Sequence, residues 1–262
     1  MSSEPPVLEL RGVTKSFGSV QALTDVDFEV RHGEVMALVG DNGAGKSTLI
    51  KCIAGIHPMD EGQVFFEGQP VSIHGPKDAA KLGIEVVYQD LALCDNLDVV
   101  QNMYLGREEH DWFQRLKEPP MEAKTSETLK SLAVTTIRSI RQPVATLSGG
   151  QRQSVAVARA VMWNSKLVIL DEPTAALGVS QTEQVLALVK RLAEQGLSVI
   201  LISHNLHDIF EAADRITVLR LGRDIGVYDR LKTTQDEIVH AITAGVPTKV
   251  SGVPGTRNGA KA

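Results

Sequence analysis

The stretch "VGDNGAGKSTLI", Val39 to Ile50, holds three glycines, a lysine and two hydroxyl groups directly after the apolar run "EVMAL". Glycines let the main chain curl so that several backbone N–H groups converge on an anion. The part "GDNGAGKS", from Gly40 to Ser47, has the spacing of a P-loop. A strand-like run before it and an amphipathic run after it fit the same structure. The stretch therefore predicts a binding site for a nucleoside triphosphate.

Each part of this loop has an expected role in holding the nucleotide. Lys46 reaches the outer phosphates, Ser47 holds Mg²⁺, and a helix from about Thr48 adds the positive end of its dipole. A glycine-rich turn before an ordinary helix is the plain structural alternative, and the patterns on both sides of the loop argue against it. The predicted nucleotide ligands in the loop are Gly40, Asp41, Asn42, Gly43, Ala44, Gly45, Lys46, Ser47 and Thr48.

The composition limits the class of protein. At 262 residues and 43% hydrophobic, the chain can bury the core of one large domain, or of a core with a smaller lobe. A net charge of -5 disfavours a nucleic-acid partner. The longest apolar runs have the length of strands, the N-terminus lacks a secretory leader, and Cys52 and Cys94 are expected to be reduced thiols. We therefore expect a soluble protein that reaches a membrane only from the cytoplasm and through a partner.

Strand and helix patterns alternate along the chain in a way typical of an α/β fold. Two alternating segments near the start, "PVLELRGVTKSF" and "VQALTDVDFEVR", predict antiparallel strands. From about Leu91 to Asn164 helical periodicity replaces the strand signals, and the alternation of strands and helices then returns. The predicted fold is a P-loop NTPase core with a mixed, mainly parallel sheet, N-terminal antiparallel strands and an inserted helical subdomain.

We expect a single domain over residues 1–244. Its core is predicted at about 7–90 and 165–244, and its helical subdomain at about 91–164. Residues 245–262, rich in Gly, Pro, Thr and Lys, are expected to form a disordered tail.

A pair of acids, Asp171 and Glu172, follows the apolar run "LVIL". Open parallel sheets bind their ligands at the carboxyl ends of the strands. Successive strand residues point in opposite directions, so Asp171 can hold Mg²⁺ while Glu172 faces a water poised to attack the γ-phosphate. We therefore predict Asp171 as a metal ligand and Glu172 as the general base.

The segment "TLSGGQRQSVAVARAV" predicts a second anion site. Ser148 is a natural N-cap, and Gly149 and Gly150 expose backbone N–H groups at the start of a helix. The P-loop already surrounds its own phosphates, so we expect this helix terminus to cover the nucleotide of another copy in a symmetric homodimer. A structural cap alone would leave both glycines without explanation. The ligands predicted to act in trans are Ser148, Gly149, Gly150 and Gln151.

Four motifs in this order resemble those of an ATP-binding cassette ATPase. They are "GDNGAGKST", "LSGGQRQ", "LVILDEP" and "SH" at Ser203 and His204. The resemblance covers about residues 7 to 230. It implies that the nucleotide is ATP, that Mg²⁺ accompanies it, and that the chain hydrolyses ATP.

The resemblance also assigns three further residues. Gln89 matches the glutamine that links Mg²⁺ and the attacking water to the helical lobe and the membrane subunits. His204 matches the histidine that contacts the γ-phosphate, and Phe17 matches the aromatic residue that stacks on adenine. From the residues alone, a polar strand cap for Gln89 and a core position for Phe17 stay open. The predicted catalytic residues are Glu172, His204, Gln89 and Lys46, and the predicted metal ligands are Ser47, Gln89 and Asp171.

In one loop the chain departs from the family. Gly178 follows "EPTAAL", where the family commonly has Asp in the loop that couples its two nucleotide sites. The resemblance therefore does not imply that this loop couples two nucleotide sites in this chain. The roles that it implies for the P-loop and the acidic pair are not affected.

Two longer segments, "YQDLALCDNLDVVQNMYLGRE" and "DEPTAALGVSQTEQV", resemble ATPases of bacterial carbohydrate importers of the ribose, xylose and fructose type. With one P-loop and one "LSGGQ", the chain is similar to the single-cassette branch. The resemblance implies an ATP-dependent homodimer on the cytoplasmic side of the cell membrane. Its implied partners are integral-membrane permease subunits and, indirectly, a periplasmic sugar-binding protein. A soluble cassette ATPase with a non-transport role, such as cofactor assembly, is the alternative, and no residue names the sugar.

Overall fold

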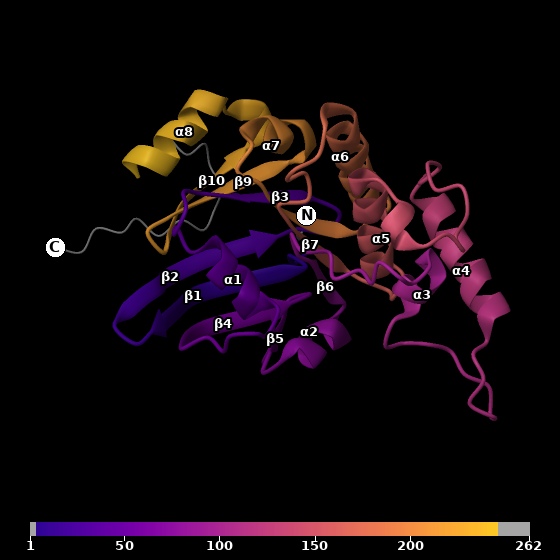
Figure 1. Ribbon diagram of the computed structural model, residues 1–262. Coiled ribbons are helices and arrows are strands. Elements are labelled where there is room, and N and C mark those ends of the chain that lie inside the picture. The colour runs from indigo at the N-terminus through magenta and orange to yellow at the C-terminus, as the bar shows by residue number, and fades with distance from the viewer. Residues whose placement is uncertain (1–3, 246–262) are drawn as a thin grey trace.

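The computed structural model describes residues 4–245, and its centre is a six-stranded sheet (Figure 1). The strand order is β10-β9-β3-β8-β7-β6. Neighbouring strands are parallel except β9 and β10, which pair antiparallel at one edge. The predicted mixed, mainly parallel sheet is therefore confirmed. The strands are β3 (Val35–Val39), β6 (Ile84–Val87), β7 (Leu167–Asp171), β8 (Ser198–Ile202), β9 (Arg215–Arg220) and β10 (Arg223–Asp229).

A second, four-stranded sheet is antiparallel throughout and has the order β2-β1-β4-β5. The first two strands form a hairpin that turns at Gly18 and Ser19. This sheet contains the antiparallel strands predicted at the start of the chain. Its strands are β1 (Leu8–Phe17), β2 (Val20–Val30), β4 (Glu61–Phe66) and β5 (Gln69–Val71).

Helices cover both faces of the central sheet (Figure 1). Helix α1 begins at Lys46, where the sequence predicted a start near Thr48. The sequence analysis missed α8, although its start carries a capping box in which Thr234 and Glu237 bond to each other's backbone. The helices are α1 (Lys46–Ile53), α2 (Pro76–Leu82), α3 (Val99–Tyr104), α4 (Glu118–Ser131), α5 (Gly149–Val161), α6 (Val179–Glu194), α7 (Leu206–Ala212) and α8 (Gln235–Ala244).

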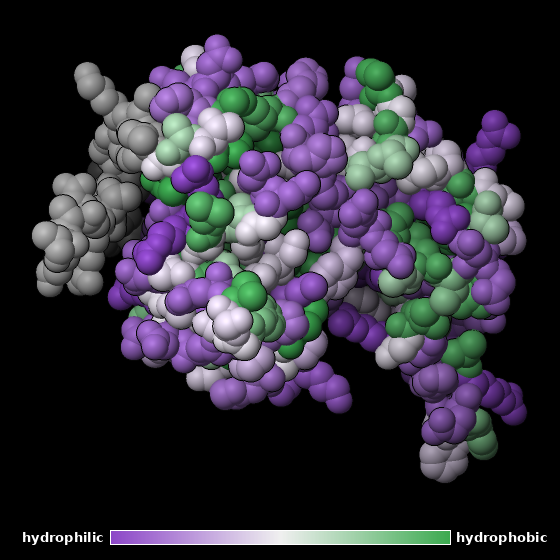
Figure 2. Space-filling view, turned by 60° about the vertical axis from the view of Figure 1, so that its left-hand side comes forward, coloured by the Kyte–Doolittle hydropathy of each residue, from purple (hydrophilic) through white to green (hydrophobic). Residues whose placement is uncertain are grey.

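Helices α3, α4 and α5 lie together at one end of the molecule (Figure 1). The segment between α3 and α4 projects from the surface, and it carries Trp112 and Phe113, which are 87% and 65% exposed. Elsewhere on the face drawn in Figure 2, polar residues separate the apolar ones into small groups. Within residues 4–245, no helix combines the length and apolar composition needed to cross a bilayer. The predicted disordered tail lies outside the described residues except for Gly245.

The central strands separate two hydrophobic cores. All five residues of β3 are buried. Because successive side chains point to opposite faces, Val35, Ala37 and Val39 join one core, whereas Met36 and Leu38 join the other. The first core is covered by α3 to α8, and the second by the antiparallel sheet with α1 and α2. Helices α1 and α5 therefore pack on opposite faces of the central sheet.

Arg141 joins the helices at the α3–α5 end of the molecule. Its Nη1 donates to Asp98 Oδ2 at 3.0 Å, and Asp98 is the N-cap of α3. Its Nη2 donates to Glu118 Oε2 at 2.7 Å, and its Nε donates to Glu122 Oε1 at 2.8 Å, both on α4. One guanidinium group thus binds three carboxylates and connects α3 and α4 to the segment that leads into α5.

We expect Arg141→Ala to lower the free energy of unfolding by about 1–3 kcal/mol, because three carboxylates would then face one another without a cation. Chemical denaturation measures this change. The control is Lys81→Ala, which removes an exposed pair with Asp78 at 3.4 Å and should change the free energy by less than about 0.5 kcal/mol. Equal effects of the two variants would show that the Arg141 network does not stabilise the fold.

Candidate nucleotide-binding and catalytic site

The predicted phosphate-binding and acidic residues follow three neighbouring strands. The P-loop follows β3, Asp171 ends β7, and His204 comes just after β8. These strands are parallel and lie in the order β3-β8-β7. Their carboxyl ends meet at one edge of the sheet, where open α/β sheets bind ligands. The structure therefore brings together the P-loop, the acidic pair and His204.

The P-loop is packed against the end of β9 and the turn that follows it. A Cβ on Gly40 would lie 2.2 Å from the carbonyl oxygen of Leu219, so no larger residue fits there. The N–H of Gly222 donates to the carbonyl oxygen of Ala44 at 3.0 Å. These two contacts fix the path of the loop between β3 and α1.

Lys46 lies against the backbone of its own loop. Its Nζ donates to the carbonyl oxygens of Gly40 and Asp41 at 2.7 and 3.1 Å. Burial lowers the pKa of Lys46. The negative charges of Glu172, Asp41 and Asp171 oppose this shift, so both predicted acids lie near the lysine.

Asp171 and Glu172 occupy different backbone conformations. Glu172 has a φ of 52°, in the left-handed region, and its N–H donates to the carbonyl oxygen of Ile202 at 2.9 Å. The sequence analysis expected the two acids to point in opposite directions because side chains alternate along a strand. Strand β7 ends at Asp171, so this alternation does not extend to Glu172. The turn at Glu172 separates them instead.

Burial also affects the acidic group that ends β7. It raises the pKa of Asp171, and the negative charge of Glu172 raises that pKa further, whereas Lys46 acts in the opposite direction. Opposing shifts of this kind on a neighbouring cation and acid are typical of functional sites.

His204 contacts Glu172 directly. Its Nδ1 lies 2.7 Å from Glu172 Oε2, and its backbone N–H donates to the same oxygen at 3.4 Å. An ionised carboxylate only accepts hydrogen bonds, so Nδ1 carries the hydrogen and Nε2 remains available. The His204 side chain is 74% exposed and that of Glu172 only 16%. The predicted base and the predicted histidine therefore form a pair that is open to a ligand on the histidine side.

Gln89 and Phe17 lie at the ends of two other strands. Gln89 is exposed and comes shortly after β6. Phe17 ends β1 and is 44% exposed, so the core position that the sequence left open for it is wrong. Its ring meets the ring of His57 at an angle of 75°, with the centroids 5.1 Å apart. Contacts of Gln89 with Mg²⁺ and of Phe17 with adenine stay predictions.

The "LSGGQ" segment begins α5 with a capping box. Ser148 is the N-cap, as the sequence predicts, and its Oγ accepts from the N–H of Gln151 at 3.4 Å. The Gln151 side chain accepts from the N–H of Ser148 at 2.8 Å and donates to the carbonyl oxygen of Thr136 at 2.6 Å. These bonds use one N–H of the Gln151 amide and leave its second N–H for another acceptor, and its predicted contact with a nucleotide stays a prediction.

Both glycines of this segment have a structural reason that the sequence analysis missed. A Cβ on Gly149 would lie 2.9 Å from Leu177 Cδ2, and one on Gly150 would lie 3.2 Å from Gln181 Cβ. Leu177 and Gln181 belong to the loop after Glu172 and to α6. Close packing on Leu177 and Gln181 is therefore a second reason for small residues here, which the argument from the cap alone did not include.

Gly178, in the same loop, differs from these glycines. It is the N-cap of α6 with a φ of -74°, which any residue can adopt. A Cβ there would meet no atom within 4 Å. Nothing in the fold of the loop therefore requires glycine in place of aspartate.

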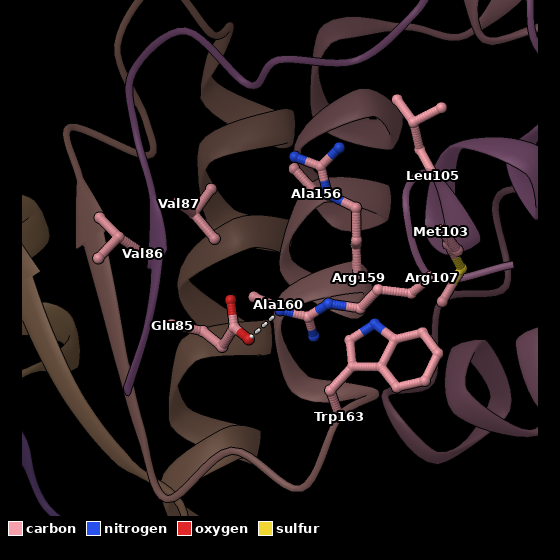
Figure 3. Close-up of a pocket in the computed structure, with 10 residues that line it drawn as sticks. All are labelled: Glu85, Val86, Val87, Met103, Leu105, Arg107, Ala156, Arg159, Ala160 and Trp163. Carbon is pink, nitrogen blue, oxygen red and sulfur yellow. Dashed lines mark hydrogen bonds and ion pairs between the residues drawn. The ribbon is translucent and has the colours of Figure 1, made fainter. Parts of the chain in front are cut away.

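A groove lies where β6, α5 and the segment after α3 meet (Figure 3). Across it, Arg107 Nη2 pairs with Glu85 Oε1 at 3.0 Å. Arg159, on α5, donates to the carbonyl oxygen of Leu91 at 2.9 Å, which ties α5 to the segment that follows Gln89. The sequence analysis missed this groove because its residues are far apart along the chain. They are Glu85, Val86, Val87, Met103, Leu105, Arg107, Ala156, Arg159, Ala160 and Trp163.

Comparisons with known proteins agree with the geometry. Residues 23–175 match the family described as ABC transporter. The chain is 46% identical to the fructose import ATP-binding protein FrcA of Rhizobium meliloti, over 92% of this chain and 95% of that protein. It is also 46% identical to the xylose/arabinose import ATP-binding protein XylG of Sulfolobus acidocaldarius, over 94% of this chain and 97% of that protein. A solved structure of the ATP-binding cassette MJ0796, dimeric, post-hydrolysis and bound to ADP and Pi, has a TM-score of 0.70 and 26% identity, over 85% of this chain and 98% of that chain.

We expect Asp171→Asn to raise the thermal unfolding midpoint of the nucleotide-free protein at pH 7. Because the folded pKa of Asp171 is raised, its ionisation weakens the folded state as pH rises through that pKa. Near pH 3 and below, the carboxyl is mostly protonated in both folded and unfolded chains, so the difference between variant and wild type should largely vanish there. Scanning calorimetry from pH 3 to 8 measures it.

Asp229→Asn provides a control of opposite sign for this measurement. Hydrogen bonds from Lys232 and from the backbone of Leu231 hold the pKa of Asp229 below its usual value, so its loss should lower the midpoint at pH 7. An Asp171→Asn midpoint at or below that of the wild type at pH 7 would contradict the raised pKa of Asp171.

Proposed function

This chain belongs to the ABC transporter family, and we propose that it is the ATP-binding and ATP-hydrolysing subunit of an importer that drives uptake of a sugar through a separate permease. The observation that carries the proposal is the 46% identity to a fructose import ATP-binding protein over nearly the full length of both chains. The same identity to a xylose/arabinose import protein points to a monosaccharide of this type. The protein would act at the cytoplasmic side of the cell membrane as a peripheral subunit.

The P-loop and α1 would hold the triphosphate of ATP. Helix α1 begins at Lys46, so its first N–H groups and the positive end of its dipole add to the anion site of the loop. Phe17, exposed at the end of β1, offers a ring for stacking on adenine. Ser47, Asp171 and Gln89 would hold Mg²⁺, since their hydroxyl, carboxylate and amide oxygens are the kind of ligand that this ion prefers.

Glu172 and His204 would carry the hydrolytic step. Glu172 accepts the proton of the attacking water, and its hydrogen bond with His204 Nδ1 keeps the carboxylate directed. To donate to the γ-phosphate, His204 would have to carry a hydrogen on Nε2 as well as on Nδ1, because phosphate oxygens only accept. Lys46 would exchange its bonds to the loop carbonyl oxygens for the phosphates and offset their charge.

A second copy of the chain would complete each nucleotide site. Helices α1 and α5 pack on opposite faces of the central sheet, which supports use of the "LSGGQ" terminus by a partner rather than by the same chain. The similar cassette MJ0796 forms a dimer bound to ADP and Pi. We infer an ATP-dependent homodimer in which Ser148 and the N–H groups of Gly149 and Gly150 contact the nucleotide of the partner.

The groove of Figure 3 is the surface that we propose for the permease. Arg107 and Arg159 face it, and Glu85 is the one carboxylate among its lining residues, so it suits a segment with an apolar face and an acidic side chain. The segment that supplies Arg107 continues to the exposed rings of Trp112 and Phe113. Arg159 would transmit a shift of the bound permease to the segment after Gln89 and to α5.

Glu172→Gln should retain ATP affinity, lose at least about a hundredfold in phosphate release, and accumulate a nucleotide-dependent dimer, because the base is lost while the binding groups remain. Phosphate-release assays and size-exclusion chromatography with ATP and Mg²⁺ measure this. Lys46→Ala is the contrasting variant and should lose ATP binding itself. Normal turnover by Glu172→Gln would remove Glu172 from its proposed role.

Partner identification tests the importer itself. The tagged chain, purified from gently solubilised native membranes, should bring down a multi-span permease and a sugar-binding protein, which mass spectrometry identifies. Arg107→Glu should lose the permease while keeping ATP hydrolysis, and Arg223→Glu, exposed at the start of β10, is the matched charge-reversal control. Recovery with soluble proteins alone would reject transport and favour a non-transport role.

A further inference from the structure

A buried acid on α7 connects the loops that carry Glu172 and His204. Asp208 is 2% exposed. Its Oδ2 accepts from Thr174 Oγ1 at 2.6 Å, and its Oδ1 accepts from Asn205 Nδ2 at 2.9 Å. Both oxygens of one carboxylate are thus used, each by a different loop.

Each partner of Asp208 sits close to a residue of the proposed reaction. Thr174 comes two residues after Glu172, and Asn205 directly follows His204. Asp208 itself has no described contact with the P-loop. Its two hydrogen bonds therefore connect it to the site through Thr174 and Asn205.

Asn205 is held in one orientation, which makes the connection specific. Its Oδ1 accepts from the N–H of His207 at 3.0 Å and so caps α7. Its backbone N–H donates to Ser203 Oγ at 3.0 Å. Because the cap uses the side-chain oxygen of Asn205, its side-chain nitrogen faces Asp208. This nitrogen only donates, so residue 208 must supply an acceptor.

The loop after β7 needs such an anchor because its backbone is unusual. Glu172 and Ala176 have φ values of 52° and 61°, and Thr174 lies between them. Residues other than glycine rarely adopt this conformation, and they keep it only when surrounding contacts hold them. The Thr174–Asp208 bond is a side-chain contact that joins this loop to α7.

We propose that Asp208 is a positioning residue that fixes the Glu172 loop against the His204 loop, so that Glu172 Oε2 and His204 Nδ1 stay paired for the attack of water on ATP. The inference rests on the proposed roles of Glu172 and His204. Asp208 sets where the two groups lie through its bonds to Thr174 and Asn205. A misplacement of about 1 Å at such a pair is enough to slow turnover strongly.

Thr174→Val tests this with the least change of shape, because it removes the hydroxyl and keeps the branched side chain. We expect kcat for ATP hydrolysis to fall by about tenfold to a hundredfold. KM and the affinity for ATP, measured by titration, should stay within about twofold, since the P-loop is untouched. Thr174→Ser, which keeps the hydroxyl, should recover most of kcat.

A matched control separates positioning from folding. Thr217→Val makes the same replacement at a fully buried threonine of β9, whose hydroxyl contacts the Met36 sulfur at 3.3 Å, and it should leave kcat near that of the wild type. Adding Thr174→Val to Asp208→Ala should lower kcat no further than Asp208→Ala alone, because both changes break one connection.

The outcomes distinguish this inference from the proposed chemistry. A kcat of Thr174→Val within twofold of the wild type, or a loss shared by Thr217→Val or matched by a loss of ATP affinity, would overturn the role of Asp208. If Glu172→Gln is inactive while Thr174→Val is normal, only the positioning role fails. If Glu172→Gln hydrolyses ATP normally, the proposed base fails, and the positioning role fails with it.

Discussion

Burial of the central strands on both faces is the constraint on which the rest of this structure depends. Every residue of β3, and Leu167 to Leu170 of β7, packs into one of the two hydrophobic cores. A strand buried on both faces has no position for a charged group along its length, so charged residues collect where such strands end. Because the strands are parallel, these ends coincide, and Lys46, Asp171 and His204 meet although they come from distant parts of the sequence.

The same burial gives the site its electrostatic character. It disfavours charge on both Lys46 and Asp171, which lie close enough for each to oppose the shift of the other. Only partial compensation results, since the pKa of Lys46 stays lowered and that of Asp171 stays raised. Charged ligands would therefore stabilise the ionised forms of both groups. A triphosphate with Mg²⁺ would supply negative charge for Lys46 and positive charge for Asp171.

The parts of the fold and site that could be predicted are those that depend on short stretches of chain. The P-loop spacing, the alternation in the strands and the Ser148 cap are local, and the structure agrees with them. The turn at Glu172 could not be read from the strand pattern, because it depends on a bond to Ile202 on a neighbouring strand. The link from Thr174 to Asp208 spans 34 positions and leaves no pattern in the sequence. Helix α8 is different, since its Thr234–Glu237 capping box was readable and was overlooked.

The close packing of Gly149 and Gly150 on Leu177 and Gln181 changes how glycine variants of the "LSGGQ" segment must be interpreted. A methyl group added at Gly149 would push on Leu177, which belongs to the loop that starts at Glu172. Such a variant would disturb two groups of one chain at the same time. One is the start of α5, which is offered to a partner, and the other is Glu172 in the chain's own site. Loss of activity in it would not by itself distinguish a failed contact between subunits from a displaced base within one, and mixed dimers with one altered chain would be needed to separate the two.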